Sequence, residues 1–171
     1  KRQGPHRPNV RNAWRSRLQE HLLANLGIVV IRFDPRSGSG YGSQSAWLAY
    51  RKLGVEEARD VEALCDWLAE QPWADAERIG MSGHSYGGYY TAYAMTHTDK
   101  LCAGIAGAPV TDWSHYDTIY TERFMSTPQD NPEGYRVSSV VNAADQLQGR
   151  LLILHGMKDD NVHPSNTMQF V

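Results

Sequence analysis

Short apolar runs alternate with amphipathic stretches along the chain, and this alternation predicts an α/β fold. Four runs are bounded by turn residues and are expected to form buried strands, namely Gly27–Phe33, Arg78–Ser82, Ala103–Val110 and Arg150–His155. Runs of this length with few polar positions are typical of strands in a parallel sheet that is covered on both faces.

Hydrophobic positions recur with the period of a helix between these runs. Glu56–Gln71 has acidic residues in its first turn and one apolar face, made by Val61, Leu64, Cys65, Trp67 and Leu68. Tyr86–His97 combines small and aromatic residues without charge, which indicates a buried helix. Arg11–Leu26 is a further amphipathic candidate, through Trp14, Leu18, Leu22 and Leu23. Alternating strands and helices imply right-handed crossovers.

Composition excludes some classes of protein. The chain has 171 residues, a net charge of -2 and 41% hydrophobic residues, which suits a single globular domain. The near-neutral charge argues against a nucleic-acid partner, and no apolar stretch approaches the roughly 20 residues of a membrane span. The two cysteines, Cys65 and Cys102, make no disulfide framework and are expected to be buried free thiols.

The glycine-rich stretch Ser37–Gly42 follows an apolar run, as a phosphate-binding loop does. Its spacing is G-x-G-x-G rather than G-x-G-x-x-G, and no G-x-x-x-x-G-K-[ST] occurs, so we interpret it as a tight turn. The sequence also contains no H-E-x-x-H and no C-x-x-C. We therefore expect neither an organic cofactor nor a metal.

Gly83-His84-Ser85-Tyr86-Gly87 matches G-x-S-x-G between a predicted strand and a predicted helix. This context is that of a nucleophile elbow, a sharp turn that lifts a serine hydroxyl to the edge of a sheet. Side chains at Gly83 or Gly87 are expected to collide with neighbouring backbone in such a turn. The N–H of Tyr86, at the start of the helix, is the expected oxyanion donor.

A nucleophilic serine on this architecture is followed in the chain by an acid and then by a histidine. Asp159 and Asp160 come just after the predicted strand Arg150–His155, where the acid belongs. By position alone both qualify, and a solvated pair that caps a helix from Pro164 onward is an equally good interpretation.

Five segments together carry a family resemblance. They are GPH at Gly4–His6, DPRSGSGYG at Asp34–Gly42, GHSYGGYY at Gly83–Tyr90, GAPVTDWSHYDTIYTERFM at Gly107–Met125 and LLILHGMKDDNVHP at Leu151–Pro164. The segments occur in the same order as in the prolyl oligopeptidase family. The chain therefore resembles the catalytic domain of that family, particularly its dipeptidyl peptidase IV branch. The resemblance implies an α/β-hydrolase fold, with a mostly parallel sheet and helices on both faces. It also implies that residues 1–171 are part of this domain, truncated at both ends, and that the family's β-propeller domain is not in this chain.

The resemblance also implies site roles. Ser85 is similar to the family nucleophile and Asp159 to the triad acid, with Asp160 its non-catalytic neighbour. Asn161 matches a side chain that binds a substrate carbonyl. The residues that match the lining of a proline pocket are Tyr86, Val110, Trp113, Tyr116, Tyr120 and Val162. From its residues alone, without the family resemblance, the aromatic run from Trp113 to Tyr120 is interpreted as part of the core or as a surface patch.

The chain departs from the family pattern in two places. The one histidine after Asp159 is His163, which matches a non-catalytic position, whereas the family's triad histidine lies on a later loop that is expected beyond Val171. An earlier histidine would break the usual order. The family's oxyanion tyrosine is replaced by Arg2, which leaves the second donor open. The chain as it stands is thus expected to be nearly inactive.

Three functions are compatible with these patterns. The first is a serine peptidase that cuts peptides after proline or alanine, through an acyl-enzyme on Ser85. The second is a carboxylesterase on the same fold, although no HGGG-type oxyanion motif is present. The third is a non-catalytic interaction domain. Homo-oligomers are common in the family, and a homodimer is one option for this protein. The compartment and the choice among dipeptide, tripeptide and internal cleavage stay open.

Overall fold

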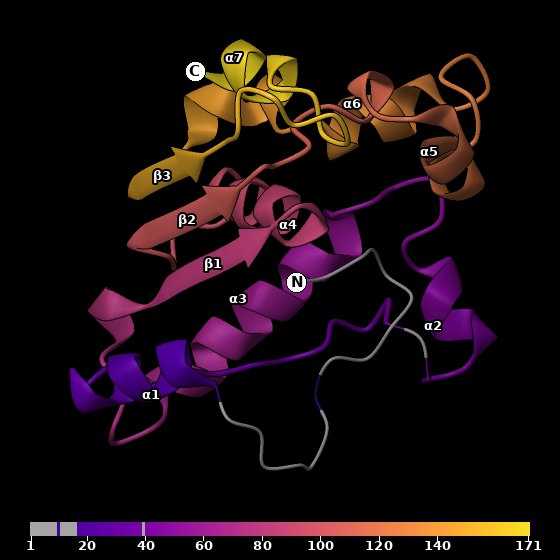
Figure 1. Ribbon diagram of the computed structural model, residues 1–171. Helices are drawn as coiled ribbons and strands as arrows, with labels where there is room; N and C mark the ends of the chain where they lie inside the picture. Colours follow the sequence, from indigo (N-terminus) through magenta and orange to yellow (C-terminus); the bar gives the residue numbers. More distant parts are fainter. Residues whose placement is uncertain (1–9, 11–16, 39) are drawn as a thin grey trace.

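A parallel sheet forms the centre of the computed structural model, which describes residues 10, 17–38 and 40–171. Its strands, in spatial order, are β1 (Gly80–His84), β2 (Ala103–Gly107) and β3 (Arg150–Leu154). Figure 1 shows the three arrows pointing the same way, so their carboxyl ends meet at one edge. The expected α/β class, with its parallel sheet, is confirmed.

Helices connect and flank these strands. The α-helices are α1 (Leu18–Asn25), α2 (Ser43–Trp47), α3 (Val55–Ala69), α4 (Tyr86–Met95), α5 (Thr118–Met125), α6 (Pro132–Ser138) and α7 (Ser165–Phe170). Shorter 3₁₀ segments are η2 (Ala76–Arg78), η3 (Trp113–His115) and η4 (Val141–Gln146). Among the described residues, no helix combines the length and the apolar character that crossing a membrane requires.

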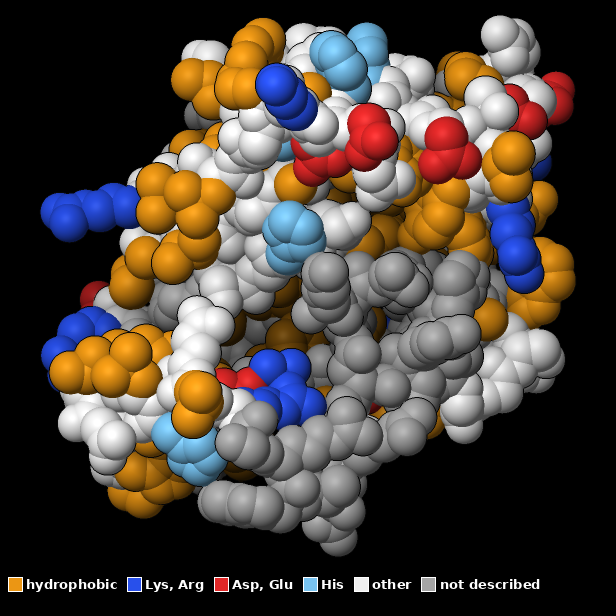
Figure 2. Space-filling model, in the orientation of Figure 1, with side chains coloured by type: hydrophobic (Ala, Val, Ile, Leu, Met, Phe, Trp, Pro, Cys, Tyr) orange, Lys and Arg blue, Asp and Glu red, His pale blue; other side chains and the backbone are white. Residues whose placement is uncertain are grey.

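Among the described residues, the helices that pack on the sheet cover one of its faces, whereas the sequence predicted a sheet covered on both faces. Met81, Gly104 and Leu151 are in register across the strands, and they contact side chains from α3 and α4. The residues that alternate with them point the other way, and Ile105 and Leu152 are 45% and 53% exposed. Figure 2 shows hydrophobic side chains uncovered over the strands on this open face.

Two long predicted helices are confirmed. Glu56–Gln71 corresponds to α3, and Tyr86–His97 corresponds to α4, all of whose residues are buried. Buried tyrosines in α4 need hydrogen-bond acceptors, and they find them on neighbouring segments. The hydroxyls of Tyr89 and Tyr90 donate to the carbonyls of Leu53 and Glu57 at 2.7 and 2.5 Å. These bonds tie α4 to the start of α3.

The prediction of a buried strand at Gly27–Phe33 is wrong. The segment has no strand pairing, and Ile28 and Val29 are 50% and 60% exposed. An apolar β-branched run becomes a strand only where a neighbouring strand completes its hydrogen bonds. In the described part of the chain, β1 pairs with β2 alone, so the run is extended but unpaired.

The predicted helix Arg11–Leu26 is confirmed only over α1, and residues 11–16 lie outside the described ones. Its apolar side does not pack as expected, because Leu18 and Leu22 are 81% and 59% exposed. One cysteine also differs from expectation, since Cys65 is buried but Cys102 is exposed.

Glycines allow α4 to lie directly against the strands. A side chain at Gly83 would overlap the carbonyl of Gly87, and one at Gly88 would overlap the carbonyl of Gly107. The expected collision at Gly87 is wrong, because a side chain there meets nothing within 4 Å. The close contact between helix and sheet therefore depends on Gly83 and Gly88, while Gly87 faces open space.

Gly88→Ala is expected to lower the free energy of unfolding by about 1–3 kcal/mol, because the added methyl group forces α4 away from β2. Gly87→Ala is the matched control in the same helix turn, and alanine's better helix propensity makes it neutral or stabilising by up to about 1 kcal/mol. Urea unfolding of both variants beside the parent chain measures the difference. Equal effects at the two positions would contradict this account of the packing.

Candidate active site

Ser85 occupies the sharp turn between β1 and α4. Its backbone has φ 59° and ψ −120°, a region that costs a non-glycine residue about 1–3 kcal/mol. The surrounding contacts hold it there, since its N–H donates to the carbonyl of Gly107 at 2.8 Å and its carbonyl accepts from Tyr89 at 2.9 Å. The turn places Ser85 at the carboxyl edge of the sheet, as a nucleophile elbow does.

Tyr86 is the first residue of α4. The first N–H groups of a helix have no partner within the helix, and they carry the positive end of its dipole. The backbone N–H of Tyr86 is therefore a candidate oxyanion donor beside Ser85, and this role stays a prediction. Its side chain is 4% exposed and donates to the Glu57 carboxylate at 2.6 Å. Burial, together with the charge of Glu57, holds the pKa of this phenol well above its ordinary value.

Asp159 lies in the loop that follows β3. Its Oδ1 accepts from the backbone N–H groups of Asn161 and Val162, at 3.1 and 3.0 Å. The Val162 N–H is the main cause that lowers the pKa of this carboxyl, and the Asn161 N–H and the imidazoles of His155 and His84 act in the same direction. Asp159 is therefore an oriented, ionised carboxylate at neutral pH.

The pair Asp159 and Asp160 does not cap the following helix. Pro164 is the N-cap of α7, and the N–H of Ser165 at the start of that helix donates to the His163 ring rather than to either aspartate. Asp160 is exposed, whereas Asp159 forms a hydrogen-bonded turn of its own. These contacts favour Asp159 as the organised member of the pair.

Ser85 and Asp159 follow β1 and β3, which are separated by β2 alone. Neighbouring strands lie roughly 4.8 Å apart, so the two chain segments leave the same sheet edge about 10 Å from each other. One imidazole between a serine and a carboxylate fits a gap of this size. The arrangement is the one that a Ser-His-Asp triad uses.

His155 is the histidine that approaches Asp159, with Nε2 at 3.8 Å from Oδ2. Both of its ring nitrogens are already engaged. Nε2 lies 2.7 Å from the carbonyl of Val162 and Nδ1 lies 2.7 Å from the hydroxyl of Thr167. A carbonyl only accepts, so Nε2 carries the proton and the ring is locked in place. His155 thus supports the Asp159 loop and is poorly placed to take a proton from Ser85.

His163, the histidine after the acid, faces its own loop. Its Nδ1 lies 2.9 Å from the hydroxyl of Ser165 and accepts from the Ser165 N–H at 3.2 Å. Arg2 and the Gly4–His6 motif lie outside the described residues, so the second oxyanion donor stays a prediction.

The residues of the predicted proline pocket come together beside the elbow. The Trp113 ring lies 5.8 Å from that of Tyr86 and 5.9 Å from those of Tyr116 and Tyr120. Trp113 is 1% exposed, so it belongs to the core, while Tyr116 and Tyr120 are partly buried at its edge. Val110 and Val162, both buried, complete the group.

Asn161 is exposed at the rim of this aromatic group. Its Oδ1 accepts from the hydroxyl of Tyr116 at 3.1 Å. Because its oxygen is engaged in this way, the Asn161 NH₂ group is oriented and donates to no described residue. A fixed amide donor of this kind suits a substrate carbonyl.

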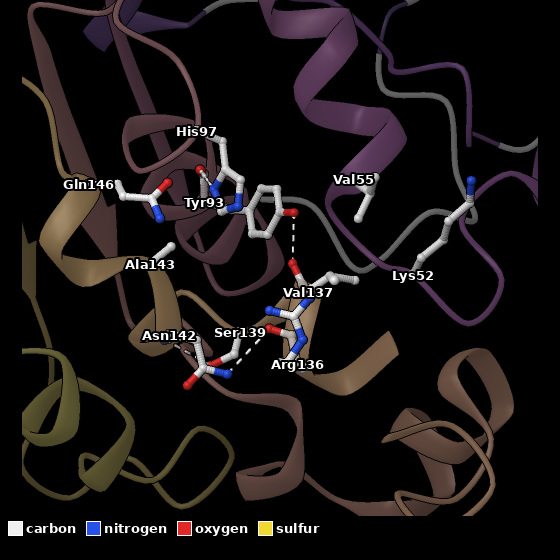
Figure 3. Close-up of a pocket in the computed structure, with 10 residues that line it drawn as sticks. All are labelled: Lys52, Val55, Tyr93, His97, Arg136, Val137, Ser139, Asn142, Ala143 and Gln146. Carbon is white, nitrogen blue, oxygen red and sulfur yellow. Dashed lines mark hydrogen bonds between the residues drawn. The ribbon is translucent and has the colours of Figure 1, made fainter. Parts of the chain in front are cut away.

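A separate cavity of about 360 Å³ lies at the other end of α4 (Figure 3). It is lined by Tyr93 and His97, whose rings stack at 3.8 Å, with Lys52 and Arg136 on the opposite side. The two cations are already paired, Lys52 with Glu56 and Arg136 with Glu133. The cavity therefore offers no unpaired cation, and it is distinct from the group around Ser85.

Two residues that shape the site were not found by sequence reasoning. Gly88 lies outside the G-x-S-x-G motif, although the neighbouring Gly87-Gly88 pair marks a close helix contact. From the sequence alone, Glu57 was counted only among the acidic residues in the first turn of a predicted helix, but its side chain is fully buried against Tyr86. Glu57 stands three residues after the N-cap Gly54 and accepts from its N–H, which is the glutamate half of a capping box, and this spacing was the available signal.

Comparisons with known proteins agree with this geometry. A sequence profile of the prolyl oligopeptidase family matches residues 14–171. The chain is 42% identical to "Probable dipeptidyl-aminopeptidase B" of Fusarium vanettenii over 96% of its own length and 18% of the relative's. The chain is 38% identical to the protein of the same name in Aspergillus oryzae, over 98% of its own length and 19% of that relative's.

A solved structure gives the same result. The crystal structure of Porphyromonas gingivalis dipeptidyl peptidase 4 superposes with a TM-score of 0.90 at 44% identity, over 97% of this chain and 24% of that one. The chain thus spans about a fifth of the length of the curated relatives it matches. On the profile, the relatives and the fold together, this chain belongs to the prolyl oligopeptidase family of serine peptidases and is part of a catalytic domain of the dipeptidyl peptidase IV type.

Proposed function

We propose that this chain is the central part of the catalytic domain of a longer serine peptidase, which removes dipeptides by cutting after proline or alanine. The relatives that it matches carry the names dipeptidyl-aminopeptidase B and dipeptidyl peptidase 4, and they are about four to five times as long. In this proposal a β-propeller domain and the triad histidine belong to segments outside residues 1–171. The peptide substrate is the expected partner.

The reaction follows the order of a Ser-His-Asp triad. The histidine takes the proton from Ser85 Oγ, which attacks the carbonyl carbon of the scissile bond. The N–H of Tyr86 donates to the oxygen that becomes negative. The histidine then gives its proton to the leaving amine, and water repeats the sequence to release the acyl group. Asp159 orients the imidazole, and without that imidazole the chain retains only residual catalysis.

The aromatic group explains a preference for proline. A proline ring is apolar and rigid, so the partly buried rings of Tyr116 and Tyr120, backed by the buried ring of Trp113, cover it with little loss of freedom. Asn161 donates to the carbonyl of the residue before proline. The observation that carries the proposal is the strained backbone of Ser85, since a φ of 59° at a serine persists only where the surrounding structure enforces it.

The role of Ser85 as the nucleophile can be tested in the longer protein. That protein is expected to hydrolyse a Gly-Pro anilide, and Ser85→Ala is expected to reduce kcat by about 10⁶-fold, because the nucleophile is lost. Steady-state kinetics measure this. Ser82→Ala, a serine on the exposed face of β1, is the matched control and retains the activity. Normal turnover by Ser85→Ala contradicts the proposal, and hydrolysis of p-nitrophenyl acetate without cleavage of the anilide indicates an esterase.

A further prediction follows from the lowered pKa of Asp159. A carboxyl with a depressed pKa stabilises the fold above its unfolded pKa of about 3.9, and this contribution is lost as the pH falls through the folded value. Asp159→Ala is therefore expected to be less stable than the parent at pH 6, with the gap narrowing toward pH 3. Urea unfolding across this pH range measures the gap. Asp160→Ala is the control, and a gap independent of pH contradicts the assignment.

A further inference from the structure

Glu57 is a buried carboxylate close to the residue that follows the candidate nucleophile. It lies in the first turn of α3 and is 0% exposed. A carboxylate in such a place is costly unless hydrogen bonds replace the water that it has lost. Its partners therefore indicate what the carboxylate holds in position.

Within the described part of the chain, donors from three separate segments reach this carboxylate. Oε1 accepts from the hydroxyl of Ser37 at 2.9 Å and from the hydroxyl of Tyr86 at 2.6 Å. Oε2 accepts from the N–H of Gly54 at 2.6 Å. One side chain thus links the glycine-rich loop, the start of α3 and the first residue of α4.

The bond to Tyr86 has the closest connection with the chemistry. The Tyr86 ring is enclosed by Trp113 and Tyr89, with ring centroids 5.8 and 5.6 Å away, and Glu57 holds its hydroxyl end. The same residue carries the N–H that faces the developing oxyanion. Because the ring is packed between Trp113 and Tyr89 and held at its hydroxyl, its side-chain torsions are restricted, and we infer that this restricts the backbone N–H as well.

We propose that Glu57 is a positioning residue, which sets the oxyanion donor of Tyr86 through its hydrogen bond to the Tyr86 hydroxyl. This inference rests on the proposed function, since it concerns the transition state of acylation on Ser85. An oxyanion donor acts on the transition state more than on the bound substrate, so its displacement lowers kcat and leaves KM nearly unchanged.

Glu57→Gln tests the hydrogen bond from the Tyr86 hydroxyl, because glutamine has almost the same shape as glutamate. If the amide oxygen keeps the place of Oε1, the NH₂ group faces the N–H of Gly54, and two donors oppose each other. If the amide is reversed, the NH₂ group faces the hydroxyl of Tyr86, which loses its acceptor. Either orientation disturbs the position of α4. Tyr86→Phe removes the same hydrogen bond from the other side and leaves Ser37 and Gly54 on the carboxylate.

The experiment compares both single variants and the double variant in the longer protein, using a Gly-Pro anilide as substrate. Glu57→Gln is expected to lower kcat by about tenfold or more, with KM within about twofold of the parent value. In the Tyr86→Phe background, Glu57→Gln is expected to have a smaller further effect on kcat than in the parent, because the Tyr86 hydrogen bond is already absent and only the contacts with Ser37 and Gly54 are still disturbed. Thermal unfolding corrects each rate for the folded fraction.

The affinities of two ligands provide a second measurement, because a purely structural role of Glu57 would not change one affinity more than the other. A boroproline dipeptide forms a tetrahedral adduct with the serine, whereas the product dipeptide ending in proline resembles the ground state. Glu57→Gln is expected to weaken the boronate by about tenfold and the product dipeptide by less than about twofold. Equal losses for the two ligands, or fully additive effects in the double variant, overturn the proposal.

Glu56→Gln is the matched control. The neighbouring glutamate pairs with Lys52 and Arg59 at 2.7 and 2.9 Å, so it is expected to keep the parent kcat. An equal fall in kcat for Glu56→Gln also overturns the proposal. Failure of the proposed function is separate, because in that case the parent protein and Ser85→Ala are equally inactive on the anilide. If Glu57→Gln does not fold, Tyr86→Phe and its boronate affinity give the decisive result.

Discussion

The close contact between helix α4 and the strands beneath it is the constraint on which this site depends. Gly83 and Gly88 allow backbone to meet backbone at that contact, where any side chain would overlap a carbonyl oxygen. The contact forces Ser85 into a left-handed conformation and holds it there through the carbonyl of Gly107. The positions of the nucleophile and of the first N–H of the helix both follow from this packing.

Much of this arrangement was predictable from local patterns. Short apolar runs bounded by turn residues mark the strands, and a longer run without charge marks the buried helix, so β2, β3 and α4 were predicted close to their observed bounds. The carboxylate after β3 was also predictable, because a parallel sheet brings the carboxyl ends of its strands to one edge. The choice between Asp159 and Asp160 needed more, namely the family resemblance, and the hydrogen bonds of Asp159 favour the same residue.

The remaining features depend on contacts between distant parts of the chain, which a local pattern does not contain. Gly27–Phe33 has the composition of a strand, but no described strand pairs with it. Gly87 and Gly88 are equivalent in the sequence pattern, yet only a side chain at Gly88 would collide with the backbone of β2. The neighbours Glu56 and Glu57 differ in the same way, since one meets surface cations and the other meets a buried phenol.

The uncovered face of the sheet affects how the isolated chain behaves in solution. Ile105, Leu152 and Leu154 form an adjoining apolar strip that is about half exposed. Contiguous apolar surface of this kind drives molecules together. Recombinant residues 1–171 will therefore self-associate as their concentration rises, and mild detergent or a charged substitution at Leu152 will improve their solubility.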